Sequence, residues 1–232
     1  MSKTVSILIT NHNAADTIAL CVESIRRYTQ YPHSIIVYDD ATDPEQYDDL
    51  VYLREAHEKG WIRLIEGNPR IMHGKAVARL LDEAKADLAM VMDCDIQVKG
   101  TGWLEDMVKA QESTDACLVA DMESFADGDD LQCAFSSWFF MLDLKQYPHV
   151  KAEWCYTPRE DGGIRPTGWQ IWKKIHDQGR VITPLPKSVK ERFYHHTHIS
   201  VLSLPKEGPN YEIWKQRYSV IQSELRELRA SI

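Results

Sequence analysis

Two aspartates, Asp93 and Asp95, stand directly after the apolar run from Leu88 to Met92. Side chains two positions apart on a strand share one face, so these carboxylates would repel each other unless a cation lay between them. Oxygen ligands in an open site suit Mg²⁺ or Mn²⁺, which are often held together with substrate phosphates. The pair therefore predicts a divalent-metal site, and the alternative is a pair of solvated turn aspartates.

Three histidines, His195, His196 and His198, lie just before Ile199 and form a second group of candidate metal ligands. Neutral imidazole is a common ligand for metals in proteins. In an extended backbone His196 and His198 share a face, while His195 points away from it. The alternation therefore predicts His196 and His198 as ligands. The alternative is that these histidines are packed in the core or lie on the surface.

Polar residues also end two other apolar runs, which begin at Val5 and Ser34. An acidic side chain at a strand end can accept a hydrogen bond from a ribose hydroxyl or a base N–H. The aspartates after the second run also have the composition of a turn, which is the alternative interpretation. We expect the nucleoside-binding residues to be Thr10, Asn11, Asn13, Asp39 and Asp40.

Two further groups are candidates for contact with a phosphate or a reacting proton. Lys75 and Arg79 lie one helical turn apart, and they would either meet phosphate oxygens or form a solvated helix face. Asp161 lies in a Gly-rich segment, where a carboxylate could act as general base toward an acceptor hydroxyl. The alternative for Asp161 is a plain polar loop.

Strand-like and helix-like runs alternate through the first 120 residues, and they must position these side chains. The expected strands cover residues 5–10, 34–38, 61–65, 88–92 and 116–120. Between them apolar residues recur at helical spacing. The alternation predicts an α/β fold with a Rossmann-like, mostly parallel sheet and helices on both faces. In such sheets ligands bind at the carboxyl ends of the strands, which is where the polar residues stand.

The second half of the chain is less regular. We expect a strand at 135–142, a loop at 149–168, a helix at 167–179, and short strands near Val181 and Ile199. After Pro209, apolar residues from Tyr211 to Leu228 recur at alternating steps of three and four, which predicts an amphipathic helix. This helix either folds back on its own domain or pairs with a copy of itself, which would make a homo-oligomer through residues 209–230.

The composition limits the class of protein. The formal net charge of −8 argues against bulk electrostatic capture of nucleic acid, although it leaves room for a local basic groove. No apolar run reaches the ~18–20 residues that a membrane helix needs. The five cysteines are scattered without metal-ligand spacing, so we expect free thiols in a cytoplasmic protein.

Several of these segments, taken in order, resemble the family-2 type of GT-A fold glycosyltransferases. Residues 5–13 are similar to the family's opening strand, and Cys21–Ile25 with Gln30–Pro32 resemble its first helix and turn. The segment 36–43, with Asp39 and Asp40, resembles the acidic segment that contacts the nucleoside. Residues 74–95 resemble the segment that leads into the family's Asp-x-Asp motif. The resemblance covers residues 5–108.

The resemblance implies a nucleotide-sugar donor, usually a UDP-sugar, and Mn²⁺ or Mg²⁺ bound at Asp95 and the diphosphate. A late histidine ligand occurs in many such enzymes, and His196 or His198 is placed for that role. The family's Gly-Glu-Asp base motif is replaced here by Arg159-Glu-Asp-Gly162. Asp161 is the expected base if the reaction inverts configuration. The absence of the Gln-x-x-Arg-Trp motif of processive members implies transfer of one sugar per turnover.

The resemblance also implies a division of the chain. Residues 1–208 are expected to form one GT-A domain, with a nucleotide-sugar-binding half at 1–120 and an acceptor half at 121–208. Residues 209–232 are expected to form the C-terminal amphipathic helix.

Other functions remain open from the sequence. A nucleotidyltransferase uses a related sheet, but its first strand is usually followed by a Gly-rich loop with Arg or Lys. A metal-dependent hydrolase of nucleotide sugars, or a binding module without catalysis, would also use these residues. The acceptor is a glycan, a protein, a small molecule or a modified nucleic acid base.

Overall fold

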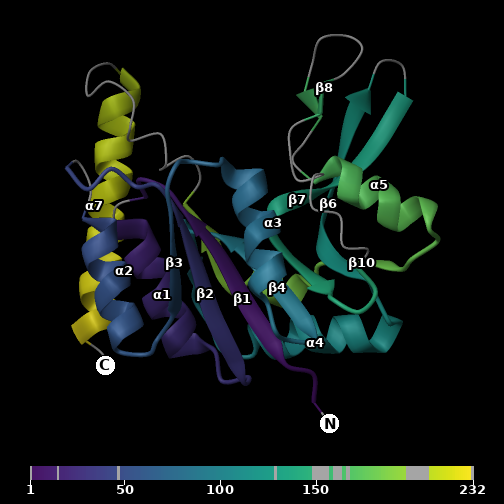
Figure 1. The fold of residues 1–232 in the computed structure, drawn as a ribbon, viewed down its shortest axis with the longest axis horizontal. Helices are drawn as coiled ribbons and strands as arrows, with labels where there is room; N and C mark the ends of the chain where they lie inside the picture. Colours follow the sequence, from purple (N-terminus) through teal and green to yellow (C-terminus); the bar gives the residue numbers. More distant parts are fainter. Residues whose placement is uncertain are drawn as a thin grey trace.

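The computed structural model of the protein describes residues 2–14, 16–45, 48–127, 130–147, 157–158, 164–165, 168–196 and 209–230. Most of these residues belong to an α/β arrangement in which helices cover a central sheet (Figure 1). Every helix in this part of the chain is too short or too polar to cross a lipid bilayer.

The central sheet has seven strands in the order β10-β6-β7-β4-β1-β2-β3. Neighbouring strands run parallel, except that β7 is antiparallel to both β4 and β6. The strands are β1 (Val5–Asn11), β2 (His33–Asp40), β3 (Arg63–Gly67), β4 (Leu88–Asp93), β6 (Leu118–Asp127), β7 (Asp130–Asp143) and β10 (Ile182–Pro184). The α/β fold class with a mostly parallel sheet is therefore confirmed.

Two short ribbons lie outside the central sheet. β5 (Ile96–Val98) pairs antiparallel with β11 (Phe193–His195), and β8 (Thr157–Pro158) pairs with β9 (Ile164–Arg165). The first ribbon joins the segment that follows Asp95 to one almost a hundred positions later. This ribbon is not predicted by the sequence, because three-residue strands carry too little pattern to detect.

Helices cover both faces of the sheet, and the central strand β4 is apolar and buried from Leu88 to Met92. Along β4, Met90 and Met92 pack with α1 (Asp16–Tyr28), α2 (Asp49–Glu58) and α4 (Trp103–Thr114). The alternate residues, Ala89 and Val91, pack with α3 (His73–Glu83) and α5 (Trp169–Asp177) on the opposite face. A strand buried on both faces reads as a continuous apolar run, which is what the sequence showed. A one-turn helix, α6 (Lys187–Lys190), precedes β11.

The boundaries differ from expectation in a few places. The second helix begins at Asp49 rather than near Pro44, where the chain instead forms a turn. The strand expected at 135–142 is the second half of the longer β7. The strand expected near Ile199 and most of the 149–168 segment lie outside the described residues.

The C-terminal helix α7 (Pro209–Ala230) lies along α1, as Figure 1 shows. Ile221, Leu225 and Leu228 are buried against Ala19 and Leu20 of α1. The expectation that this helix folds back on its own domain is therefore confirmed. The side chains of Tyr211 and Trp214, which belong to the same predicted stripe, lie outside the described part of the chain.

The carboxyl ends of β1, β2 and β4 meet at one edge of the sheet, as in other parallel sheets. In Figure 1 this edge faces the side from which the β6–β7 hairpin and the first turns of α7 project. Among the polar residues expected to do chemistry, the group at these strand ends and in the loops after them is Thr10, Asn11, Asn13, Asp39, Asp40, Asp93 and Asp95.

Candidate functional site

Three side chains at this edge form a cluster of metal-ligating groups. Asp93 ends β4, Asp95 lies in the turn that follows, and His195 ends β11. One ligand atom from each lies within 4.8 Å of the others. His195 Nε2 is 3.1 Å from Asp95 Oδ1. Two carboxylates and an imidazole at this spacing are a suitable ligand set for Mg²⁺ or Mn²⁺ with positions left for a substrate.

The electrostatics of the cluster favour a cation. Asp93 Oδ1 and Asp95 Oδ1 are both enclosed, and neither accepts a well-aligned hydrogen bond from the described residues. Burial, and then the negative charge of Asp95, raise the pKa of Asp93 well above its usual range, while His195 acts in the opposite direction. A divalent cation would remove this repulsion, so the residues present fit a metal ion.

The structure turns His195, and not His196, toward the carboxylates. His196 is buried and its Nε2 lies 3.0 Å from Gln97 Oε1. Desolvation lowers the pKa of His196, with smaller effects of nearby charges. The two histidines do lie on opposite faces, as strand alternation requires, but the pairing of His195 with Ile96 decides which face meets the aspartates. His198 lies outside the described residues.

His73, at the first position of α3, is a neighbour of the cluster that the sequence analysis missed. Its Nε2 lies 3.9 Å from Asp93 Oδ1, and its Nδ1 lies 3.1 Å from the hydroxyl of Thr10. Thr10, expected to contact a nucleoside, is thus paired with a histidine at the metal cluster. One feature of the sequence could have pointed to His73: it stands directly before Gly74, where the family resemblance resumes.

Asn11 is the centre of a buried polar network at the end of β1. Its Nδ2 donates to Asp39 Oδ1 at 2.8 Å, and to Thr42 Oγ1 and Asp49 Oδ2 at 3.2 Å each. Asn13 extends the network, because its backbone N–H donates to Thr42 Oγ1 and its Oδ1 accepts from the N–H of Asp43. These bonds fasten the 41–43 loop to the end of β1.

Asp49, the first residue of α2, is a second member that the sequence analysis missed. Only 2% of the residue is exposed, and its Oδ2 accepts from the backbone N–H of Ala14 at 2.7 Å. Desolvation raises the pKa of Asp49 to about 6, although hydrogen bonds from Asn11 and Ala14 counteract it. Neither Asp49 Oδ1 nor Asn11 Oδ1 has a hydrogen-bond partner among the described residues. Its local sequence carries no signal for this role, because Asp49 lies in a polar stretch at the start of a helix.

Asp40 holds a different loop. Its two oxygens accept from the backbone N–H groups of Ile71 and Met72 at 2.6 and 2.8 Å, and Arg70 Nε lies 3.8 Å away. Met72 has φ of 74° and ψ of 151°, a region that residues other than glycine rarely occupy. Asp40 therefore stabilises a strained turn directly before α3.

Asp39 and Asp40 are both buried and bonded within the protein. Asp39 also accepts from the backbone N–H and hydroxyl of Thr42. In this structure they hold the 41–43 and 70–72 loops at the carboxyl edge. Direct contact of either carboxylate with a nucleoside, as expected from the sequence, stays a prediction.

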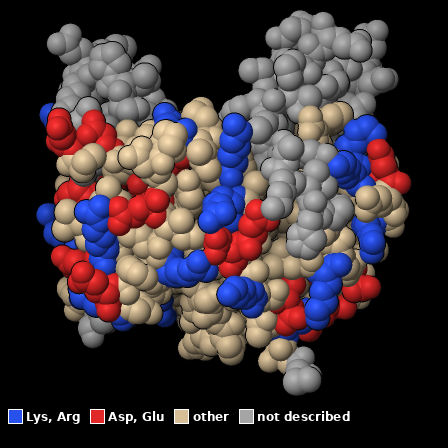
Figure 2. Space-filling view, in the orientation of Figure 1, with Lys and Arg blue, Asp and Glu red and all other residues tan. Residues whose placement is uncertain are grey.

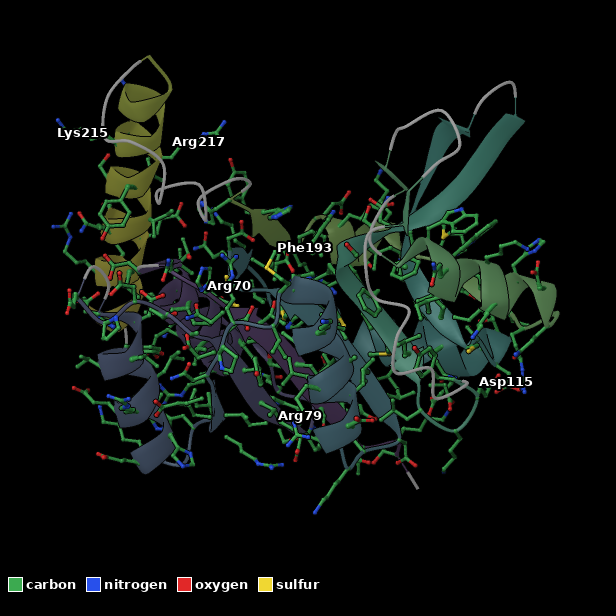
Figure 3. The ribbon with its side chains drawn as sticks, turned by 45° about the horizontal axis from the view of Figure 1, so that its top comes forward. Arg70, Arg79, Asp115, Phe193, Lys215 and Arg217 are labelled. Carbon is green, nitrogen blue, oxygen red and sulfur yellow. The ribbon has the colours of Figure 1, made fainter. Side chains whose placement is uncertain are left out.

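The two cationic candidates, Lys75 and Arg79, lie one turn apart on α3. Arg79 forms an ion pair with Glu83 at 3.0 Å and is half exposed, whereas Lys75 is exposed one turn earlier on α3. Figure 3 shows Arg79 low on α3, while Arg70 and Phe193 lie near the carboxyl edge of the sheet. The structure thus places Arg79 as a helix-surface residue. Asp161 lies outside the described residues.

Charged side chains of both signs are interspersed on the face shown in Figure 2. In the described part of the chain several basic residues form ion pairs with acidic neighbours, such as Arg63 with Glu83 and Arg54 with Glu66. Among the described residues, this face shows no single basic surface of the kind that captures nucleic acid by charge alone.

Comparisons with known proteins place the chain among glycosyltransferases. The sequence model of Glycosyl transferase family 2 matches residues 6–157. No curated protein sequence matched. The structure resembles that of the mannosyltransferase PcManGT from Pyrobaculum calidifontis in complex with GDP-Man and Mn²⁺, with a TM-score of 0.60 and 14% identity. That likeness covers 99% of this chain and 74% of the other.

Two further structures are similar over part of the chain. GalNAc-T7 with UDP, GalNAc and Mn²⁺ has a TM-score of 0.53 and 14% identity, and the likeness covers 62% of this chain and 36% of that one. S. aureus TarS in complex with UDP-GlcNAc has a TM-score of 0.49 and 13% identity, over 62% of this chain and 46% of that one. The chain therefore spans less than half the length of these two. The family match covers more than half of the chain, and this protein belongs to glycosyl transferase family 2, with the GT-A fold.

Proposed function

We propose that this protein transfers a single sugar from a nucleotide-sugar donor to an acceptor hydroxyl, with Mn²⁺ or Mg²⁺ bound by Asp93, Asp95 and His195. The observation that carries the proposal is the cluster of these three side chains at the carboxyl edge of the sheet. The match to glycosyl transferase family 2 supports the reaction class. The two enclosed carboxylates repel each other, which supports a bound cation.

The three ligands come from two backbone segments, which the fold brings together. Asp93 ends a central strand and Asp95 lies in the turn two residues later. The pairing of Ile96 with His195 then places His195 at the end of the β5–β11 ribbon that adjoins Asp95. A divalent cation bound there supplies positive charge to the leaving diphosphate. His198, which lies outside the described residues, is a secondary candidate for the same site.

Two loops at the edge support the donor's nucleoside in this proposal. The loop at 41–43 is fastened through Asn11, Asn13 and Asp39, and the loop at 70–72 through Asp40. We propose that Thr10 contributes to the site through its hydrogen bond with His73. We also propose that Lys75, one turn before Arg79 on α3, is the nearer of the two cations to the phosphates. The carboxylates of Asp39 and Asp40 already accept hydrogen bonds from these loops. The backbone atoms and side chains of the loops are therefore the groups available to contact the nucleoside.

The transfer step needs a base if it inverts configuration at the sugar. We propose that Asp161 accepts the proton of the acceptor hydroxyl. A new bond then forms between the acceptor oxygen and the anomeric carbon, while the bond from that carbon to the diphosphate oxygen breaks. The nucleoside diphosphate leaves with the bonding electron pair.

A UDP-sugar is the first donor to test, as the family resemblance implies. GDP-mannose is the second, because the structure with GDP-Man resembles this chain over nearly its whole length. The acceptor is a glycan, a protein, a small molecule or, less in keeping with the net charge of −8, a modified nucleic acid base. Free Cys21, Cys94 and Cys117 support a cytoplasmic location.

A panel of UDP- and GDP-sugars tests the proposal, using thermal shift with and without Mn²⁺ and then turnover assays. We expect one donor class to raise the melting temperature only when Mn²⁺ is present. Release of nucleoside diphosphate should then depend on an added acceptor. Rapid release with water alone would favour a hydrolase, and release of pyrophosphate from a nucleoside triphosphate would favour a nucleotidyltransferase. Donor binding without any turnover across the acceptor panel would favour a binding module.

A further inference from the structure

We propose that Trp138 on β7 is a positioning residue for the metal site, because its indole ring holds the His195 imidazole in the orientation that aims Nε2 at Asp95. The two rings stack with centroids 4.5 Å apart and an interplanar angle of 28°. The proposal rests on the proposed function, since it takes Asp93, Asp95 and His195 as metal ligands.

The backbone of His195 is fixed separately from its ring. Pairing of His195 with Ile96, and the hydrogen bond from the His196 N–H to the Asp95 carbonyl at 2.9 Å, hold the main chain beside the Asp95 turn. These bonds leave the side-chain torsions of His195 free. The stacking contact with Trp138 restricts the rotation of the ring, and 19% of the side chain remains exposed.

Trp138 stands in the right part of the sheet for this role. The antiparallel register of β7 pairs Phe139 with Met92, so Trp138 is one residue further, at the level of Asp93. Asp93 on β4 and Trp138 on β7 therefore face each other across one strand pair. A slip of this register would displace both.

The indole is itself held by aromatic neighbours from two strands. Phe193 meets it edge to face, with centroids 5.6 Å apart and an angle of 69°. Phe193 also stacks on Phe139 at 4.4 Å, and Phe139 is fully buried. Since β7 belongs to the central sheet and β11 to the separate ribbon, these rings connect the ribbon to the sheet.

The chain contains a matched pair of rings outside the site. Trp172 stacks on His176 of the same helix, α5, with centroids 5.1 Å apart and an angle of 21°. His176 is largely exposed and its charged partner is Asp177, not a member of the metal cluster. A substitution of Trp172 removes the same kind of contact without touching His195.

The first experiment measures Mn²⁺ affinity by electron paramagnetic resonance and calorimetry, with no nucleotide present. Loss of an outer contact that orients a metal ligand typically costs about 10–100-fold in affinity. We expect Trp138→Leu to weaken Mn²⁺ binding by about 10-fold or more. Trp138→Phe retains a ring face and should lose less, and Trp172→Leu should bind Mn²⁺ as the wild type does.

The second experiment uses fluorescence, and it does not require Trp138→Leu to fold. Paramagnetic Mn²⁺ quenches an indole at close range, whereas Mg²⁺ does not. The chain has seven tryptophans, so we expect Mn²⁺ to quench a fraction of the emission in the wild type and in Trp172→Leu. In Trp138→Phe most of this quenching should disappear, even at Mn²⁺ concentrations that saturate the site.

The outcomes separate the two proposals. Wild-type Mn²⁺ affinity in Trp138→Leu, or quenching that persists in Trp138→Phe, overturns the role of Trp138 and leaves the metal site intact. If Asp95→Asn binds Mn²⁺ as tightly as the wild type, the metal site itself is overturned, and the role of Trp138 with it. Weakened binding in both Asp95→Asn and Trp138→Leu, with Trp172→Leu unchanged, supports both proposals.

Discussion

His195 Nε2 lies 3.1 Å from Asp95 Oδ1, although the two residues are a hundred positions apart in the chain. The β5–β11 ribbon makes this contact, because it pairs the segment after Asp95 with the segment that ends at His195. The parallel sheet by itself would bring only the two aspartates to this edge. The ribbon adds an imidazole nitrogen to the two carboxylates, and such a set would suit a cation that accepts both oxygen and nitrogen ligands.

Asp95→Asn should abolish Mn²⁺ binding at this site and leave the fold intact, because the amide keeps the shape of the carboxylate without its charge. We expect turnover to fall by about 100-fold or more, which corresponds to ~3 kcal/mol of lost transition-state stabilisation. Excess EDTA should have a similar effect on the wild type. Asp87→Asn is the control, since Asp87 precedes the opposite end of β4 and bonds Thr4 and Lys145. Full activity of Asp95→Asn would refute the assignment.

His195→Ala should weaken Mn²⁺ binding by about 10-fold or more, since it removes one of three ligands. His196→Ala should have little direct effect on the metal, because that side chain pairs with Gln97 and faces away from the aspartates. Calorimetric titration of each variant with Mn²⁺ makes the comparison. A larger effect of His196→Ala would restore the arrangement that strand alternation alone predicted.

Asp49 makes stability depend on pH. Its pKa in the fold is about 6, above the ~3.9 of an unfolded chain, so the folded state keeps the proton over this interval. The free energy of unfolding contributed by this group is therefore highest below about pH 4 and falls as the pH rises to 6. Asp49→Asn removes the titration, so the variant should gain about 2–3 kcal/mol relative to the wild type between pH 4 and pH 8. Urea unfolding at several pH values measures this difference, and a constant difference would contradict the prediction.

Asp40→Ala should destabilise the protein by about 3 kcal/mol, because the N–H groups of Ile71 and Met72 lose a charged acceptor. The strained backbone at Met72 should relax, so affinity for the nucleotide should fall as well. Urea unfolding and calorimetry with UDP or GDP measure the two effects. Asp177→Ala is the control, since Asp177 forms an exposed ion pair with Lys173 and should cost less than ~1 kcal/mol.

Ile221→Ala tests the docking of α7. Ile221 is fully buried against α1, so its truncation should cost about 2–4 kcal/mol in the free energy of unfolding. The preceding residue, Val220, is 50% exposed, and Val220→Ala should change stability by less than ~0.5 kcal/mol. Equal changes in the free energy of unfolding for the two variants would contradict the packing of Ile221 against α1. Light scattering on the full chain tests the separate prediction of a homo-oligomer, which would have to use other residues of α7.

Much of the fold follows from local patterns in the sequence. Apolar runs such as Leu88–Met92 are continuous because the strand is buried on both faces, and the segments between runs carry the helical period. Right-handed crossovers then leave few ways to order such strands, and they bring the carboxyl ends to one edge. For this reason the spacing of Asp93 and Asp95 was enough to predict carboxylates at a ligand-binding edge.

The tertiary structure decided which distant side chains complete that edge. Alternation puts His195 and His196 on opposite faces, but only the pairing with Ile96 determines that His195 meets the aspartates. His73 and Asp49 were missed for the same reason, since each becomes a neighbour of a strand end only when its helix docks. Local sequence encodes periodicity, whereas contacts between distant segments depend on register and packing across the whole core.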